Sequence, residues 1–136
     1  MTDFLDQVSK TGLGELAESM GIELVEASAD LLVGRMPVAG NRQPFGLLHG
    51  GASVVLAESL GSIAANLHAG PERVAVGIEV SATHHRSASS GHVTGTARAV
   101  SLGRTLATYE IVIVDDEGRR TCTSRLTCLL RDRPSG

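Results

Sequence analysis

The sequence predicts an α+β fold in which an antiparallel sheet curls around one long, buried helix. Three observations lead to this prediction: a segment from Gly50 to about His68 is apolar on most sides, four later segments alternate between apolar and polar residues, and the connections between those segments are short. Short connections favour antiparallel pairing, and a sheet with one apolar face can bury that face against an apolar helix. With 136 residues, of which 42% are hydrophobic, the chain has the size and the core of a single domain spanning residues 1–136.

Composition excludes several classes of function. The formal net charge is −3 and aromatic residues make up 2% of the chain, so the basic surface and stacking aromatics that nucleic-acid binding uses are missing. No apolar run is long enough to span a bilayer, and the N-terminus lacks the features of a secretory signal. Cys122 and Cys128 fall in one predicted strand, about 20 Å apart, so they cannot pair with each other. We therefore expect buried thiols, a cytoplasmic protein, and neither nucleic acid nor membrane as a partner.

The first part of the chain is predicted to hold a helical segment, a hairpin and a loop. Residues 1–20 form the helical segment, with one or two short helices from residue 3 onward. Residues 22–26 and 31–36 are strand-like and flank a turn near residues 28–30. Residues 37–48 form a loop, because the turn-forming residues cluster there: Pro37, Gly40, Asn41, Pro44 and Gly46.

Residues 50–68 form the clearest helix in the sequence. Apolar side chains on nearly all sides indicate a buried helix, and Gly70-Pro71 ends it. Such a helix has more apolar surface than one concave sheet covers. The surplus predicts a second subunit, most simply in a two-fold dimer.

The last part of the chain is predicted to be a four-strand meander. Its strands are residues 74–82, 93–99, 104–114 and 119–130, and residues 115–118 form a hairpin turn. Alternation predicts that one face of the first strand carries its larger apolar residues, namely Val74, Val76, Ile78, Val80 and Ala82.

The segment from Gln43 to Gly51 carries candidate groups for polarising a carbonyl. Gln43 and His49 flank a tight loop, and the Gly50-Gly51 pair opens the helix. The first N–H groups of a helix have no partner within it, and glycines let a carbonyl or an anion approach them closely. With the Gln43 amide they would form an oxyanion-type site. Taken singly, a loop Gln and a His are more often solvated polar residues.

Glu58 places a carboxylate within the apolar helix. The alternative is an exposed position on an amphipathic helix, but its neighbours leave little polar face. A carboxylate in such surroundings is a candidate base or nucleophile, and Ser62 lies one turn later on the same stripe. Gly50 and Glu58 are about 12 Å apart along the helix axis. If both act on one carbonyl, Glu58 must come from a partner chain.

A second group of polar residues suits phosphate recognition. His84-His85-Arg86-Ser87 follows a predicted strand, and Ser101-Leu102-Gly103-Arg104 lies in a turn between strands. Arginines beside hydroxyls and a glycine are typical of phosphate sites, although ordinary polar loops look alike. A metal site built on His84, His85 and His92 is disfavoured, because no carboxylate or Cys lies at a supporting spacing.

With these residues the chain resembles hotdog-fold acyl-CoA thioesterases of the phenylacetate-degradation type, which include one branch of the 4-hydroxybenzoyl-CoA thioesterases and the 1,4-dihydroxy-2-naphthoyl-CoA hydrolases. The resemblance covers nearly the whole chain from about residue 12. It rests on the following segments: residues 43–51 (QPFGLLHGG), 56–59 (LAES), 84–87 (HHRS), 102–104 (LGR) and 124–127 (SRLT).

The resemblance implies a hotdog fold, homodimers that commonly form a dimer of dimers (a homotetramer), and no metal or other cofactor. It implies that Glu58 is the catalytic carboxylate and that the Gly50 N–H and Gln43 polarise the thioester carbonyl. His49 would assist near the carbonyl or leaving group, and Ser62 would position the carboxylate or water. The coenzyme A site would contain the remaining matched polar residues: His84, Arg86, Ser87, Gly103 and Arg104.

The sequence leaves several alternatives open. The chain could be a hotdog hydratase or dehydratase acting on an enoyl thioester, or a non-enzymatic acyl-CoA binding module. The acyl group is expected to be aromatic, but medium-chain groups and a carrier-protein thioester remain candidates. Whether Glu58 attacks the carbonyl directly or activates water also stays open.

Overall fold

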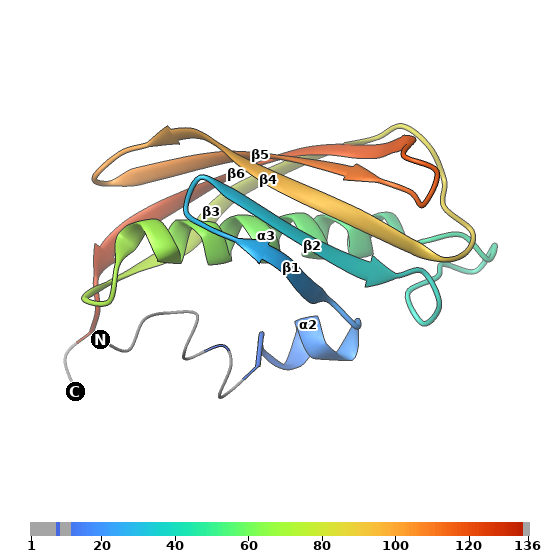
Figure 1. Ribbon diagram of the computed structural model, residues 1–136, viewed down its shortest axis with the longest axis horizontal. Coiled ribbons are helices and arrows are strands. Elements are labelled where there is room, and N and C mark those ends of the chain that lie inside the picture. Colours follow the sequence, from blue (N-terminus) through green and yellow to red (C-terminus); the bar gives the residue numbers. More distant parts are fainter. Residues whose placement is uncertain (1–7, 9–11, 135–136) are drawn as a thin grey trace.

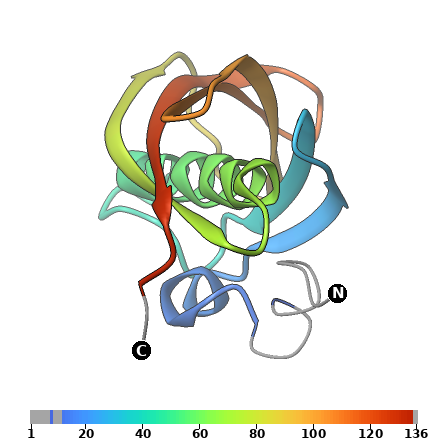
Figure 2. The same ribbon diagram turned by 90° about the vertical axis from the view of Figure 1, so that its left-hand side faces the viewer.

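A computed structural model of the chain describes residue 8 and residues 12–134. It shows a six-stranded antiparallel sheet wrapped around the helix α3 (Gly50–Ala69), as predicted (Figures 1 and 2). The strands are β1 (Glu23–Ala27), β2 (Leu31–Pro37), β3 (Arg73–His84), β4 (His92–Leu102), β5 (Leu106–Val114) and β6 (Arg120–Asp132), and the short helix α2 spans Glu15–Ser19. Most of the helical segment predicted before residue 12 lies outside the described residues.

The predicted four-strand meander is wrong at its first step. The sheet order is β1-β2-β4-β5-β6-β3, so β3 pairs with β6 at one edge, and β4 pairs with β2. The connection over residues 85–91 is not a tight turn, because its backbone bonds elsewhere. The N–H of His85 donates to Thr121 O of β6 (2.7 Å), and the carbonyls of Ala88 and Gly91 accept from Leu48 N–H (2.8 Å) and Val38 N–H (2.9 Å).

The predicted facing of β3 is also wrong over its first half. Val76 and Ile78 are exposed, at 39% and 56%. The pairing with β6 shifts register between Gly77 and Glu79, and such a bulge exchanges the faces of the residues on either side of it. Before the bulge Gly77 faces α3, and after it Val80 packs against the core.

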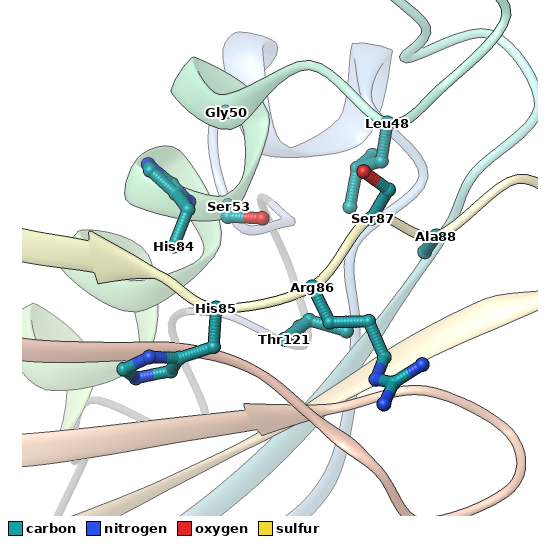
Figure 3. Close-up of a pocket in the computed structure, with 9 residues that line it drawn as sticks. All are labelled: Leu48, Gly50, Ser53, His84, His85, Arg86, Ser87, Ala88 and Thr121. Carbon is teal, nitrogen blue, oxygen red and sulfur yellow. The ribbon is translucent and has the colours of Figure 1, made fainter.

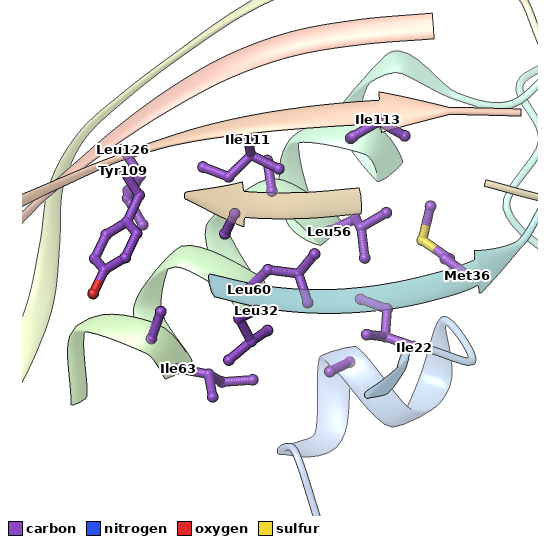
Figure 4. Packing of buried hydrophobic residues seen from close by; sticks show 14 of the residues in the cluster. Ile22, Leu32, Met36, Leu56, Leu60, Ile63, Tyr109, Ile111, Ile113 and Leu126 are labelled. Atoms are coloured by element: carbon purple, nitrogen blue, oxygen red, sulfur yellow. The ribbon is translucent and has the colours of Figure 1, made fainter. Parts of the chain in front are cut away.

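Aliphatic side chains fill the space between α3 and the sheet (Figure 4). Leu56 and Leu60 of α3 are fully buried against the sheet, and glycines let the two layers approach closely. A Cβ on Gly61 would lie 2.6 Å from Leu126 Cδ2, and one on Gly95 would lie 2.8 Å from Leu60 Cδ1. The core therefore needs almost no aromatic residues; buried Tyr109 donates its hydroxyl to Ala29 O at 2.7 Å.

Both cysteines are free and buried in β6, as predicted. Helix α3 ends at Gly70, whose φ of 84° lies in the region that glycine favours. Among the described helices, none is both long and apolar enough to cross a membrane.

Candidate active site

The first turn of α3 is capped by His49. Its Nδ1 accepts the N–H of Gly51 at 2.8 Å, and its carbonyl accepts the N–H of Ala52 at 2.9 Å. Since Nδ1 is an acceptor, the neutral imidazole carries its proton on Nε2. The cap thus takes up one of the first N–H groups of the helix, which were expected to lack partners. Within the described part of the chain, the Gly50 N–H has no acceptor, whereas the Gly51 N–H is used by the cap.

The loop before α3 holds Gln43 in a fixed turn. The Gln43 N–H donates to Leu47 O at 2.8 Å, and the Gly46 N–H donates to Gln43 O at 3.1 Å. The side-chain Oε1 of Gln43 accepts the N–H of Phe45. This bond identifies Oε1 as the acceptor of the amide, so the Nε2 hydrogens remain as donors.

Asn41 ties this loop to two other parts of the fold. Its Nδ2 donates to Met20 O and to Pro37 O, both at 2.8 Å, and its carbonyl accepts the His49 N–H at 2.9 Å. Sequence reasoning treated Asn41 as one turn residue among several. The bond to Met20, which is 21 positions away, gives no periodic signal that could have revealed this role.

The N-terminal end of α3 opens into a cavity of about 270 Å³ (Figure 3). The cavity is lined by Gly50 and by residues from the end of β3 and the connection that follows it: His84, His85, Arg86 and Ser87. The His84 ring lies against Gly50, where an added Cβ would be 3.2 Å from Nε2, while Arg86 extends away from the helix in Figure 3. Among the described residues, no three His, Cys, Asp or Glu side chains lie close enough to hold a metal ion.

Glu58 and Ser62 line a different cavity, of about 330 Å³, on the flank of α3. Both side chains are half-buried, so they form a polar strip on a helix that is otherwise apolar on most sides. Burial raises the pKa of the Cys128 thiol, a hydrogen bond with Ser62 opposes that rise, and the Glu58 carboxylate adds to it. Ser62 and Glu58 lie one helical turn apart and line the same cavity.

One chain does not bring the predicted site residues together. Gly50 and Glu58 line two separate cavities. The two residues are about 12 Å apart along the axis of α3. Gly103 lies at the far end of the helix, where its carbonyl bonds to His68 Nε2 at 2.8 Å. Residues 103–104 are thus roughly 27 Å along the helix axis from the cavity that contains Arg86 and Ser87.

Comparisons with known proteins agree on one family. The model of the Thioesterase superfamily matches residues 45–122. The proofreading thioesterase EntH of Cronobacter turicensis is 49% identical over 124 residues, which cover 90% of each chain.

Solved structures agree as well. Thioesterase HI1161 from Haemophilus influenzae has a TM-score of 0.89 at 35% identity and covers 97% of this chain and 93% of its own. A glutamine-to-alanine variant of thioesterase PA1618 from Pseudomonas aeruginosa has a TM-score of 0.87 at 40% identity. The match covers 98% of this chain and 97% of the PA1618 chain. The sheet wraps around α3 as in these solved structures, and the sequence matches the same family. The chain therefore belongs to the Thioesterase superfamily and is a hotdog-fold thioester hydrolase.

Proposed function

We propose that this thioesterase hydrolyses a small, aromatic acyl thioester of coenzyme A in an active site built from two copies of the chain. The observation that carries the proposal is the division of the polar groups along α3. The carbonyl-polarising groups lie at Gly50, and the carboxylate of Glu58 lies two turns away in another cavity. Each cavity holds half of what thioester hydrolysis needs.

The donor half-site stabilises negative charge on the carbonyl oxygen. The free N–H of Gly50 lies at the positive end of the α3 dipole, and the Gln43 amide in the preceding loop would add its Nε2 hydrogens as donors. The Nε2–H of His49 supplies a further donor near the carbonyl or the leaving sulfur. A thiol has a pKa of about 8.5, so its thiolate leaves without a strong acid.

Glu58 either attacks the carbonyl carbon itself or activates the water that attacks it, with Ser62 positioning the carboxylate or the water. In one route Glu58 attacks the carbon and expels the thiolate, and water then hydrolyses the resulting anhydride. In the other route Glu58 takes a proton from water as the water attacks. Label in the Glu58 carboxylate after single-turnover hydrolysis in ¹⁸O-labelled water would establish the first route, because water then attacks the Glu58 carbonyl of the anhydride. The second route places label only in the released acid.

An antiparallel pair of α3 helices would bring the Gly50 end of one copy to Glu58 of the other. The edge strand β3, with exposed Val76 and Ile78, is the proposed joining edge. The same symmetry would bring residues 103–104 of one copy toward His84, Arg86 and Ser87 of the other, where they would hold the nucleotide and phosphates of coenzyme A. We propose a homodimer that pairs into a homotetramer, in the cytoplasm, where the two free buried thiols persist.

The experiment is a thiol-release assay on a panel of acyl-CoA and acyl-carrier-protein thioesters, ranked by kcat/KM. Aromatic acyl-CoA should rank highest; a higher rank for the carrier-protein thioester of the same acyl group would assign the natural carrier instead. Glu58→Ala should lower kcat sharply to a small residual value, and Gln43→Ala should lower kcat by about 10²–10³, the usual effect of losing one oxyanion donor. Near wild-type turnover by Glu58→Ala on the best substrate would refute the proposed chemistry.

A further inference from the structure

We infer that Leu13 and Leu16 form the outer wall of an acyl-binding groove along α3, and that Leu16 sets the size of the acyl group. This inference rests on the proposed function, because it takes Glu58 as the group that reaches the thioester carbonyl. It assigns a substrate-selecting role to the N-terminal segment, which lies outside the loop and helix that carry the chemistry.

The groove lies between α2 and α3. Helix α2 covers the side of α3 that faces away from the sheet (Figures 1 and 2), and the cavity of about 330 Å³ separates the two. Its walls are mainly apolar, with Leu13 and Leu16 on one side and residues of α3 on the other: Val55, Glu58, Ser59, Ser62, Ile63 and Asn66. Glu58 is thus part of the wall of a mainly apolar groove, with its Oε2 beside Gly77 of β3.

The two ends of a thioester have different chemistry, and so do the two cavities. The cavity beside Gly50 is bordered by exposed polar side chains, including His85, Arg86 and Ser87. Such a border suits the polar arm that bears the sulfur. The groove beside Glu58 suits an apolar acyl group, since apolar walls gain free energy by removing apolar surface from water.

Leu16 is placed to select substrate and contributes little to the fold. Its side chain is 60% exposed, while the neighbouring Ala17, 5% exposed, anchors α2 to the core. Leu13 is half-buried and packs against the core, so it is the more structural of the two. A substitution at Leu16 therefore changes the groove wall with little loss of core packing.

The far end of the groove is fixed by Asn66. Its Oδ1 accepts the Ala75 N–H at 3.0 Å, and its Nδ2 donates to Ser62 O at 2.8 Å and to Ala75 O at 3.2 Å. An amide held at both ends cannot swing aside to lengthen the groove. A volume of about 330 Å³ is at the low end of the roughly 300–1,000 Å³ typical of ligand pockets, which suits an aryl group better than a long chain.

The test compares kcat/KM for acetyl-CoA, benzoyl-CoA and octanoyl-CoA in wild type, Leu16→Ala and Leu16→Trp. A pocket contact of about one methylene group changes selectivity by roughly 10–200-fold. We expect Leu16→Trp to lower the benzoyl-to-acetyl ratio by about tenfold, and Leu16→Ala to raise the octanoyl-to-benzoyl ratio by a similar factor. The matched control is Val25→Ala on β1, an aliphatic side chain that is 62% exposed and lies outside the groove.

Ratios between substrates are independent of the folded fraction, so a destabilised variant still gives an interpretable result. The inference is overturned if both Leu16 variants keep both ratios within about twofold of wild type. Glu58→Ala is measured on the same three substrates. If it is inactive while the Leu16 ratios do not move, the groove assignment fails and the proposed chemistry stands; if it is active, both fail.

Discussion

Replacing Gly77 with alanine is expected to displace the Glu58 carboxylate while leaving the fold intact. Gly77 lies in β3 opposite Glu58, and an added Cβ would be 2.8 Å from Glu58 Oε2 and 3.3 Å from Leu126 Cδ1. Ordinary van der Waals contact begins at 3.4 Å, so the carboxylate must move by at least about 0.6 Å. A misplacement of about 1 Å costs roughly 10² in rate. We therefore expect kcat to fall by about 10–10²-fold.

The effect on stability should be small, because the displaced atom is the free end of a flexible side chain. We expect a loss of less than about 1 kcal/mol of unfolding free energy, in the range of a mild overpacking effect. The assay is steady-state thiol release together with urea unfolding. Val25→Ala, an exposed aliphatic position on β1 at the opposite edge of the sheet from β3, is the control and should keep its kcat.

A double-mutant cycle with Glu58→Ala tests whether Gly77 acts through the carboxylate. In the Glu58→Ala background, Gly77→Ala should cause no further loss in residual kcat, since the group that it displaces is absent. Wild-type kcat in the single variant, or an equal loss in both backgrounds, would refute this reasoning.

Two further predictions concern residues that hold the site and the sheet. Asn41→Asp removes two amide donations and places a charge against two carbonyl oxygens, so urea unfolding should show a loss of roughly 2 kcal/mol and thiol release a lower kcat; unchanged values in both would contradict the anchoring role. Burial raises the pKa of Asp115, but hydrogen bonds from the backbone and side chain of Arg119 outweigh it and hold the pKa below its usual value. The stability that Asp115 contributes is therefore present above its unfolded pKa of about 3.9 and is lost as the pH falls through the lower folded value. Asp115→Asn should be less stable than wild type near neutral pH and equal to it in strong acid; a stability difference that does not depend on pH would argue against this.

The elements of the fold could be predicted because their signals are local. Each signal depends on a few consecutive residues: the apolar side chains over residues 50–68 indicate the helix, and alternation in the later segments indicates strands. The helix and the strands appear where expected. The partner of β3 could not be predicted in this way. Pairing with β6 joins residues up to 59 positions apart, from Arg73 to Asp132, and the bulge after Gly77 reverses an alternation that the sequence shows without interruption.

The same distinction holds for the site. Gln43, Gly50 and Glu58 could be proposed because each is an unusual residue in the loop before a helix, at the helix start or within an apolar helix. If Gly50 and Glu58 act on one carbonyl, their spacing predicts that they come from two chains. The loss of the Gly51 N–H to the His49 cap depends on one side-chain rotamer, which no sequence pattern encodes. The groove wall at Leu16 depends on where α2 packs, and a single exposed leucine in a short helix carries no signal of its own.

The central claim is that each active site takes Gln43 from one copy of the chain and Glu58 from another. Mixing Gln43→Ala with Glu58→Ala chains, co-expressed with different affinity tags, tests it most directly. In a mixed dimer one site carries both substitutions and the other carries neither. With random assortment half of the dimers are mixed, so the preparation should recover roughly a quarter of wild-type kcat, and purified mixed dimers about half. If each site lay within one chain, every site would carry a substitution, and activity no higher than that of the parent variants would contradict the claim.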